Sequence, residues 1–148
     1  AMRRIIGSAY HGMHRVLDML CLNFTRDQIP AYGFHVQTQW RFIHDHQIIL
    51  ASRDMYIPYS GIIDDDWDYS PQGRPDEESS IFDVKHKEIH RFMKGSTVTN
   101  CTVSEFGDLK ISFSNNVLFE LFIPTSSKEE EWRMVDLLRN EHVVFYDI

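Results

Sequence analysis

Short runs of apolar residues, many of them alternating with polar ones, cover most of the chain. They occupy residues 17–25, 33–43 and 47–52 in the first half and residues 97–105, 109–113, 117–123 and 141–147 in the second. Alternation with a period of two is typical of a strand with one buried face. Polar turn residues separate neighbouring runs, as at residues 44–46 and 114–116. The pattern predicts antiparallel β-meanders joined by hairpin turns.

One segment has helical periodicity instead. Apolar residues recur there at helical spacing, namely Phe82, Ile89, Phe92 and Met93. Ser80 and Asp83 form a capping-box pattern in which Asp replaces the usual Glu, and a glycine follows residue 94. The sequence therefore predicts a helix near residues 81–94 packed on a sheet, in an α+β fold dominated by antiparallel strands. Residues 128–139 fit a helix through their acidic start or a strand through their apolar residues.

The two halves of the chain look alike. In each, two strand-like runs precede a Trp-Arg pair, Trp40-Arg41 or Trp132-Arg133, and another strand-like run follows. This order suggests two similar β-meander units. The alternative is coincidence, because amphipathic strands resemble one another. Either way we expect one domain over residues 1–148, since a chain of this length is typical of a single domain.

An acidic loop separates the halves. Residues 61–80 contain seven acidic residues and one base, Arg74, together with two prolines and two glycines. Carboxylates steer a basic partner, and aromatic residues among them supply burial. The predicted partner-binding residues are Asp64, Asp65, Asp66, Trp67, Asp68, Tyr69, Asp76, Glu77 and Glu78. Two alternatives stay open: the loop is only a solvated segment, or Trp67 folds back and anchors the loop itself.

The net charge of −7 argues against nucleic acid and anionic membranes as partners. No apolar run approaches the roughly 20 residues that cross a bilayer, and the N-terminal residues do not have a signal peptide's apolar region. Cys21 and Cys101 lie in apolar stretches, which predicts two buried thiols in a reducing compartment. These features predict a cytoplasmic protein.

Two pairs of histidines are candidate metal ligands. His86 and His90 share one face of the predicted helix at the spacing that zinc peptidases use, but lysine follows the first histidine where those enzymes have glutamate. His44 and His46 flank a turn and have no third ligand at a recognisable spacing. No nucleophile elbow or glycine-rich phosphate loop is present in the sequence. We therefore predict no catalytic, cofactor-binding or metal-ligating residues and no cofactor.

From about residue 17 onward the chain resembles a family of small bacterial proteins. The likeness lies in an aromatic strand ending in Trp-Arg, residues 32–41, and in the following residues 49–56. The second half contributes residues 107–113, 118–122, 131–133 and 141–144. Such proteins resemble the immunity partners of polymorphic and contact-dependent bacterial toxins, which neutralise a toxin domain, commonly a basic nuclease, by occluding its active site.

This resemblance implies that the protein is an immunity or inhibitor protein, not an enzyme, whose partner is a cognate toxin with a basic surface. The sequence leaves two alternatives: a small metal-dependent hydrolase, or a domain that binds a small ligand. The oligomeric state is not determined by the sequence.

Overall fold

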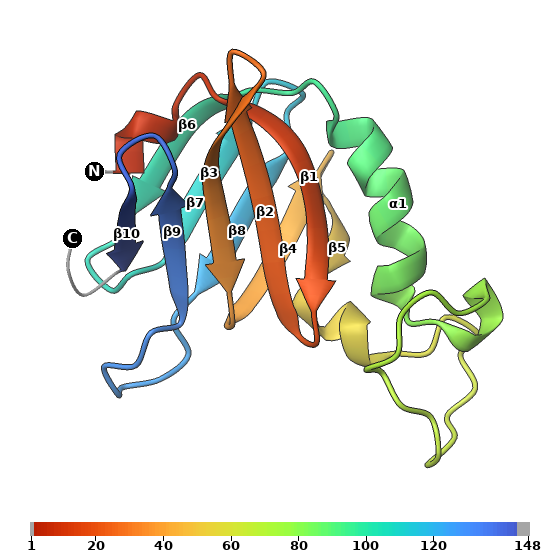
Figure 1. Cartoon of the computed structure of the whole chain (residues 1–148). Helices are drawn as coiled ribbons and strands as arrows, with labels where there is room; N and C mark the ends of the chain where they lie inside the picture. The colour runs from red at the N-terminus through yellow and green to blue at the C-terminus, as the bar shows by residue number, and fades with distance from the viewer. Residues whose placement is uncertain (1, 145–148) are drawn as a thin grey trace.

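Two antiparallel sheets face each other, with one helix along one side (Figure 1). The computed structural model describes residues 2–144. In the first sheet the strand order is β1 (Ala9–Val16), β2 (Met19–Arg26), β3 (Ile29–Val36), β9 (Trp132–Asp136), β10 (Glu141–Val144). In the second it is β5 (Gln47–Ala51), β4 (Gln39–His44), β8 (Leu118–Phe122), β7 (Leu109–Phe113), β6 (Val98–Val103). The short 3-10 helices are η1 (Met2–Ile5), η2 (Ser52–Tyr56) and η3 (Asp76–Glu78). The predicted α+β class is confirmed.

The helix α1 (Ile81–Met93) forms where the periodicity predicts it. The Ser80 side chain accepts a hydrogen bond from the Asp83 backbone N–H at 3.0 Å, so the N-terminal cap is present. Phe82, Ile89 and Met93 are buried, and the helix contacts η2, β5 and β1. Phe92, which the periodicity placed on the same face, is instead 45% exposed. The Phe82 ring meets Trp40 edge-on, with 5.9 Å between ring centroids. The helix therefore closes one side of the space between the sheets.

Two strand predictions need correction, and one ambiguous segment is resolved. β1 was missed, because a bulge between Tyr10 and Gly12 interrupts the alternation of its residues. The run 33–43 is two strands in different sheets, since the chain crosses over at residues 37–38. The ambiguous segment 128–139 contains the strand β9 and no helix. The predicted strand 141–147 begins as β10, and its last three residues lie outside the described residues.

The suspected repeat is an approximate two-fold symmetry of the strands. Strands β1, β2, β3, β9 and β10 of the first sheet correspond, in that order, to strands β6, β7, β8, β4 and β5 of the second sheet. Each half thus keeps three strands in one sheet and contributes two to the other. β-Bulges occupy equivalent places, between Tyr10 and Gly12 in β1 and between Val98 and Asn100 in β6.

The symmetry axis passes beside the starts of β1 and β6. Ala9 pairs with Thr97, 88 positions later, and the backbone N–H of Tyr10 and of Val98 donate to the carbonyls of Ser96 and Ser8, both at 2.9 Å. Gly7 and Gly95 precede these serines and have φ angles of 90° and 86°, which favour glycine. The match extends to the residues before each first strand, so the halves are related as whole units and not by strand pattern alone.

One connected core fills the space between the sheets. Trp40 and Trp132 occupy equivalent places in β4 and β9, and both are buried. Cys21 and Cys101 are buried free thiols, as predicted. No helix within residues 2–144 has the length and apolar character needed to span a membrane.

Candidate partner-binding surface

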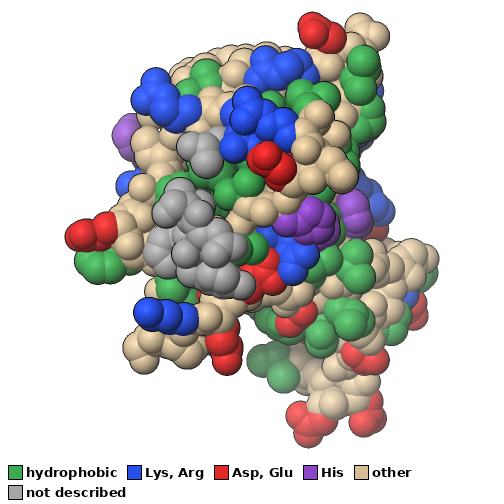
Figure 2. Space-filling view, turned by 60° about the vertical axis from the view of Figure 1, so that its left-hand side comes forward, with side chains coloured by type: hydrophobic (Ala, Val, Ile, Leu, Met, Phe, Trp, Pro, Cys, Tyr) green, Lys and Arg blue, Asp and Glu red, His purple; other side chains and the backbone are tan. Residues whose placement is uncertain are grey.

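Acidic residues are concentrated in four connections toward one end of the molecule. Because β1 and β6 start at the opposite end, the β1–β2 turn (17–18), the segment 52–80 and the β8–β9 connection (123–131) lie toward the lower end of the molecule in Figure 1. The β6–β7 turn (104–108) lies higher, on the side of β10. Together the four connections contain 14 acidic and three basic residues, a net charge of −11 within a chain of −7. We call these four connections the acidic pole. Figure 2 shows acidic side chains toward this lower end and most basic ones in the upper half.

The acidic loop closes on itself at its base. Pro58 pairs with Ser80 as an isolated antiparallel bridge. Beside it the Tyr59 N–H donates to the Ser79 carbonyl at 2.8 Å, and the Ile81 N–H donates to the Ile57 carbonyl at 2.9 Å. The loop therefore starts and ends at the N-terminus of α1.

Arg15 of β1 fixes the inner side of this loop. Its side chain has no exposed surface and donates two hydrogen bonds to the Asp83 carboxylate, both at 2.8 Å. The same guanidinium donates to the carbonyls of Leu17, Tyr69 and Pro71. A single buried cation thus connects β1, the acidic loop and the first turn of α1.

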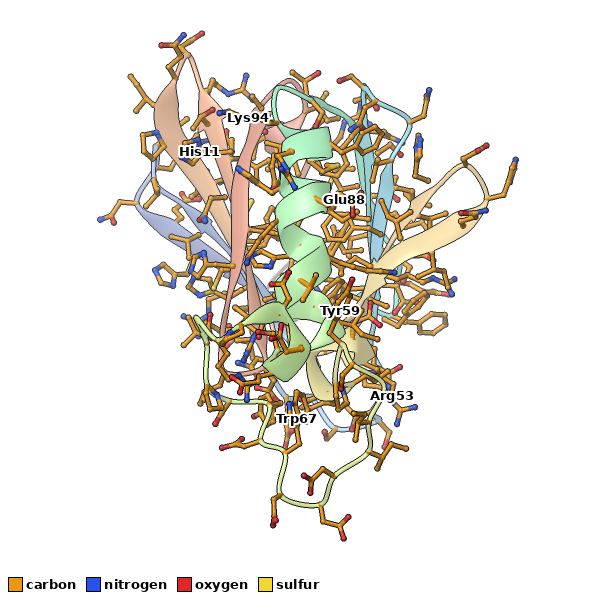
Figure 3. The ribbon with its side chains drawn as sticks, turned by 90° about the vertical axis from the view of Figure 1, so that its right-hand side faces the viewer. His11, Arg53, Tyr59, Trp67, Glu88 and Lys94 are labelled. Atoms are coloured by element: carbon orange, nitrogen blue, oxygen red, sulfur yellow. The ribbon has the colours of Figure 1, made fainter. Side chains whose placement is uncertain are left out.

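Trp67 lies within the loop, below the N-terminal end of α1 (Figure 3). Its indole N–H donates to the Glu78 carbonyl at 3.0 Å, and the Arg74 guanidinium carbon lies 5.4 Å from the centre of its ring. Arg74 also donates to the Asp68 carbonyl at 2.7 Å. Trp67 is half-buried and anchors the loop, which is the alternative that the sequence left open.

Of the predicted partner-binding residues, the aspartates and glutamates are exposed and the two aromatic residues are half-buried. Tyr69 packs edge-on against Tyr56, with ring centroids 4.9 Å apart. The exposed apolar residues of the loop are instead Ile62, 69% exposed, and Ile63, 92% exposed. Sequence reasoning missed both. An Ile-Ile pair directly before an aspartate run, inside a segment rich in glycine and proline, was the available signal.

The chain matches no family model, no curated protein and no solved structure.

The histidine pairs have other partners. The Nδ1 atom of His86 lies 2.9 Å from the Asp83 carbonyl, and its ring stacks on Phe82 with centroids 5.0 Å apart. Burial is the main cause that lowers the pKa of His86. The Nδ1 atom of His90 lies 3.0 Å from the Tyr10 hydroxyl.

His44 and His46 stand at the β4–β5 hairpin. The His44 ring packs edge-on against Phe92, with centroids 4.8 Å apart. Within residues 2–144, no three His, Cys, Asp or Glu side chains are arranged to hold a metal ion. Neither histidine pair therefore has the convergent ligands that a zinc site needs.

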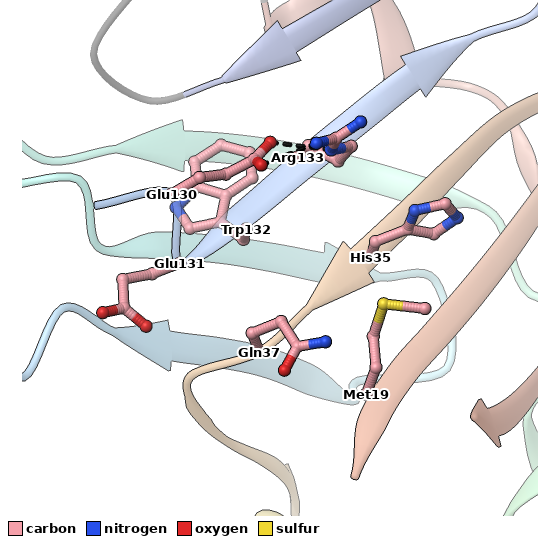
Figure 4. Close-up of a pocket in the computed structure, with 7 residues that line it drawn as sticks. All are labelled: Met19, His35, Gln37, Glu130, Glu131, Trp132 and Arg133. Atoms are coloured by element: carbon pink, nitrogen blue, oxygen red, sulfur yellow. Dashed lines mark hydrogen bonds and ion pairs between the residues drawn. The ribbon is translucent and has the colours of Figure 1, made fainter. Parts of the chain in front are cut away.

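A small cavity of about 250 Å³ lies beside the start of β9 (Figure 4). Arg133 donates to both oxygens of Glu130, at 2.7 and 2.6 Å, while Glu131 points away from this pair. Burial first, then the nearby charge of Arg133, lowers the pKa of His35. The cavity's one cation is thus already paired with a carboxylate, so an anionic ligand would have to compete with Glu130.

Proposed function

We propose that the protein is an inhibitor of the immunity type, which binds a cognate bacterial toxin domain in the cytoplasm and occludes its active site with the acidic pole. The observation that supports this most is the net charge of −11 on four connections toward one end of the molecule. A concentrated field of one sign attracts a surface of the opposite sign and accelerates association. A basic nuclease domain has such a surface, because it must hold phosphates.

Apolar residues at the same end provide burial as well as charge. Among residues 2–144, seven of the 13 exposed large hydrophobic residues belong to the acidic pole: Leu17, Tyr56, Ile57, Tyr59, Ile62, Ile63 and Phe106. An apolar centre within a charged rim is the usual organisation of a protein interface. We propose that Ile62 and Ile63 are buried against the partner while the aspartates beside them pair with lysine or arginine.

The loop is already held in one conformation by Arg15, by Trp67 with Arg74, and by the pairing at its base. A preformed loop loses less conformational entropy on binding than a flexible one. The partner then meets a fixed arrangement of carboxylates.

The test is association with the protein encoded by the adjacent gene, by co-purification and then titration at several salt concentrations. A one-to-one complex that weakens with salt and suppresses a toxic activity supports the proposal. A purified neighbour that neither binds nor is inhibited contradicts it.

Neutralising Asp64, Asp65 and Asp66 to asparagine is expected to slow association with that partner by about tenfold at low salt. Asparagine keeps the short side-chain cap that Asp64 gives the Asp66 N–H. The control neutralises Asp27, Asp45 and Glu88, which are exposed and lie outside the acidic pole. Stopped-flow association rates that fall equally in both variants would mean that only total charge matters.

Changing Ile62 and Ile63 to serine is expected to raise the dissociation rate about tenfold, since losing a well-buried contact in the complex costs about 1.4 kcal/mol or more of binding free energy. The free energy of unfolding is expected to stay nearly unchanged. Both side chains are exposed in the free protein. Surface plasmon resonance measures the rate, and Ile48→Ser, an exposed residue of β5, is the matched control. An unchanged dissociation rate would remove the isoleucines from the interface.

A further inference from the structure

A groove of about 530 Å³ opens at the acidic pole. The residues that line it are distant in sequence from the acidic loop. One wall is the β6–β7 turn with Phe106, whose side chain is 68% exposed, and the other is the β8–β9 connection. Ile123 contributes a second apolar side chain. The volume lies in the range of sites that enclose small ligands or one or two side chains.

This groove belongs to only one of the two related halves. The β3–β4 connection has two residues, 37–38, whereas its counterpart between β8 and β9 has nine, 123–131. The added residues supply most of the groove lining, namely Thr125, Ser126, Ser127, Lys128 and Glu129. Long connections on a rigid scaffold are where binding residues concentrate. The extra length is not needed to cross between the sheets, because two residues suffice for that in the other half.

Two hydrogen bonds hold the segments that line the groove. The buried Trp132 indole N–H donates to the Gly107 carbonyl at 2.9 Å, directly after Phe106. The Ile123 N–H donates to the Asp108 carboxylate at 2.8 Å, which ties the β8–β9 connection to the β6–β7 turn. These bonds fix the turn that carries Phe106 beside the connection that carries Ile123.

The charge around these apolar residues has one sign. Glu105, Glu129 and Glu131 line the groove, and Lys128 is its one basic residue. An apolar side chain would be buried between Phe106 and Ile123, and cations beside it would meet the carboxylates. We propose that the groove binds a segment of a partner protein in which an apolar side chain is flanked by lysine or arginine. This inference rests on the proposed function insofar as it assumes a basic partner, and it gives that partner a second point of contact.

The probe is a fluorescein-labelled pentapeptide with a central leucine between two pairs of lysines, followed by fluorescence anisotropy at low salt. Wild-type protein is expected to bind it with a dissociation constant of roughly 10–100 µM, in the range of small interfaces. Phe106→Ser is expected to weaken binding about tenfold, and Glu105→Gln with Glu129→Gln is expected to reduce its salt dependence. The peptide with glutamates in place of the lysines is the matched control and is expected not to bind.

The acidic-loop variant with Asp64, Asp65 and Asp66 neutralised separates this site from the loop. At about 0.15 M salt, where the Debye length is about 8 Å, it is expected to change peptide affinity by less than about twofold, because charges on another connection are largely screened there. Peptide binding lost in that variant and kept in Phe106→Ser would overturn the groove proposal, as would no binding to wild type. Peptide binding that fails while the complex with the adjacent gene's product forms contradicts the groove alone. The reverse pattern contradicts the proposed function alone.

Discussion

Replacing Arg15 with methionine is expected to lower the free energy of unfolding by about 3–5 kcal/mol, the usual effect of breaking a buried ion pair from one side. The Asp83 carboxylate, 14% exposed, would keep its charge and lose two charge-assisted hydrogen bonds. The carbonyls of Leu17, Tyr69 and Pro71 would lose the same donor. Methionine preserves most of the side-chain volume, so the loss reports polar contacts and not a cavity.

The pH dependence gives this prediction a second signature. Burial by itself would raise the pKa of Asp83, but the hydrogen bond and charge of Arg15 outweigh burial, so the pKa of the folded protein lies below the usual value. A carboxylate with a depressed pKa stabilises the fold above its unfolded pKa of about 3.9 and loses that contribution as the pH falls toward the folded pKa. In Arg15→Met this acid-dependent part is expected to disappear.

Urea unfolding at pH 7 and near pH 3 measures both effects. Arg53→Met is the matched control, because Arg53 is exposed at the same end of the molecule (Figure 3), and a change of less than about 0.5 kcal/mol is expected for it. Faster cleavage of the loop around residues 64–74 by a protease in Arg15→Met would show that the loop has lost its anchor. Equal stability of the two variants would contradict the role given to Arg15.

The sequence predicts local structure well where one signal is sufficient. The helix appears at Ile81–Met93, because its cap, its apolar face and its terminal glycine all act within one segment. Hairpins are likewise local, and positive φ angles at Asp45, His46 and Asn116 mark turns where the polar residues predict them. The sequence also shows directly that a Trp-Arg pair recurs in each half, and the matching strand orders of the two sheets explain this repeat.

Contacts that join distant residues could not be predicted in this way. Arg15 and Asp83 are 68 positions apart, and nothing near Arg15 distinguishes it from an exposed arginine on a strand. The strand β1 that contains it was itself missed because of its bulge. The anchor of the acidic loop therefore depends on an element that alternation does not reveal.

The acidic pole illustrates the same limit at the level of the site. The loop 61–80 is recognised as acidic from composition, but the acids at 105, 108 and 129–131 lie toward the same end only because the antiparallel strands return their connections to it. Trp67 and Tyr69 were predicted to bind a partner because they are aromatic. Their exposure, however, depends on tertiary contacts: Arg74 lies over the Trp67 ring, and Arg15 donates to the Tyr69 carbonyl. Topology thus determines the charge of the surface, and tertiary contacts determine which apolar residues are exposed on it.

Replacing Trp132 with alanine is expected to lower the free energy of unfolding by about 3–5 kcal/mol, the usual effect of removing a large buried aromatic side chain. Trp132 is 1% exposed, and its ring stacks near Phe34 with centroids 6.2 Å apart. The strand β9 that contains it comes from the second half of the chain and pairs with β3 of the first half. The lost packing therefore weakens the junction between the two halves as well as the core.

Two further variants separate packing from hydrogen bonding in this prediction. Trp132→Phe keeps a ring but leaves the buried Gly107 carbonyl without its donor, and an effect of about 1–3 kcal/mol is expected. Trp67→Ala makes the same change as Trp132→Ala at a half-buried loop position, where about 1 kcal/mol or less is expected. Urea unfolding should thus give Trp132→Ala the largest effect and Trp67→Ala the smallest. The reverse order would mean that the acidic loop, and not the packed interior between β3 and β9, stabilises this fold.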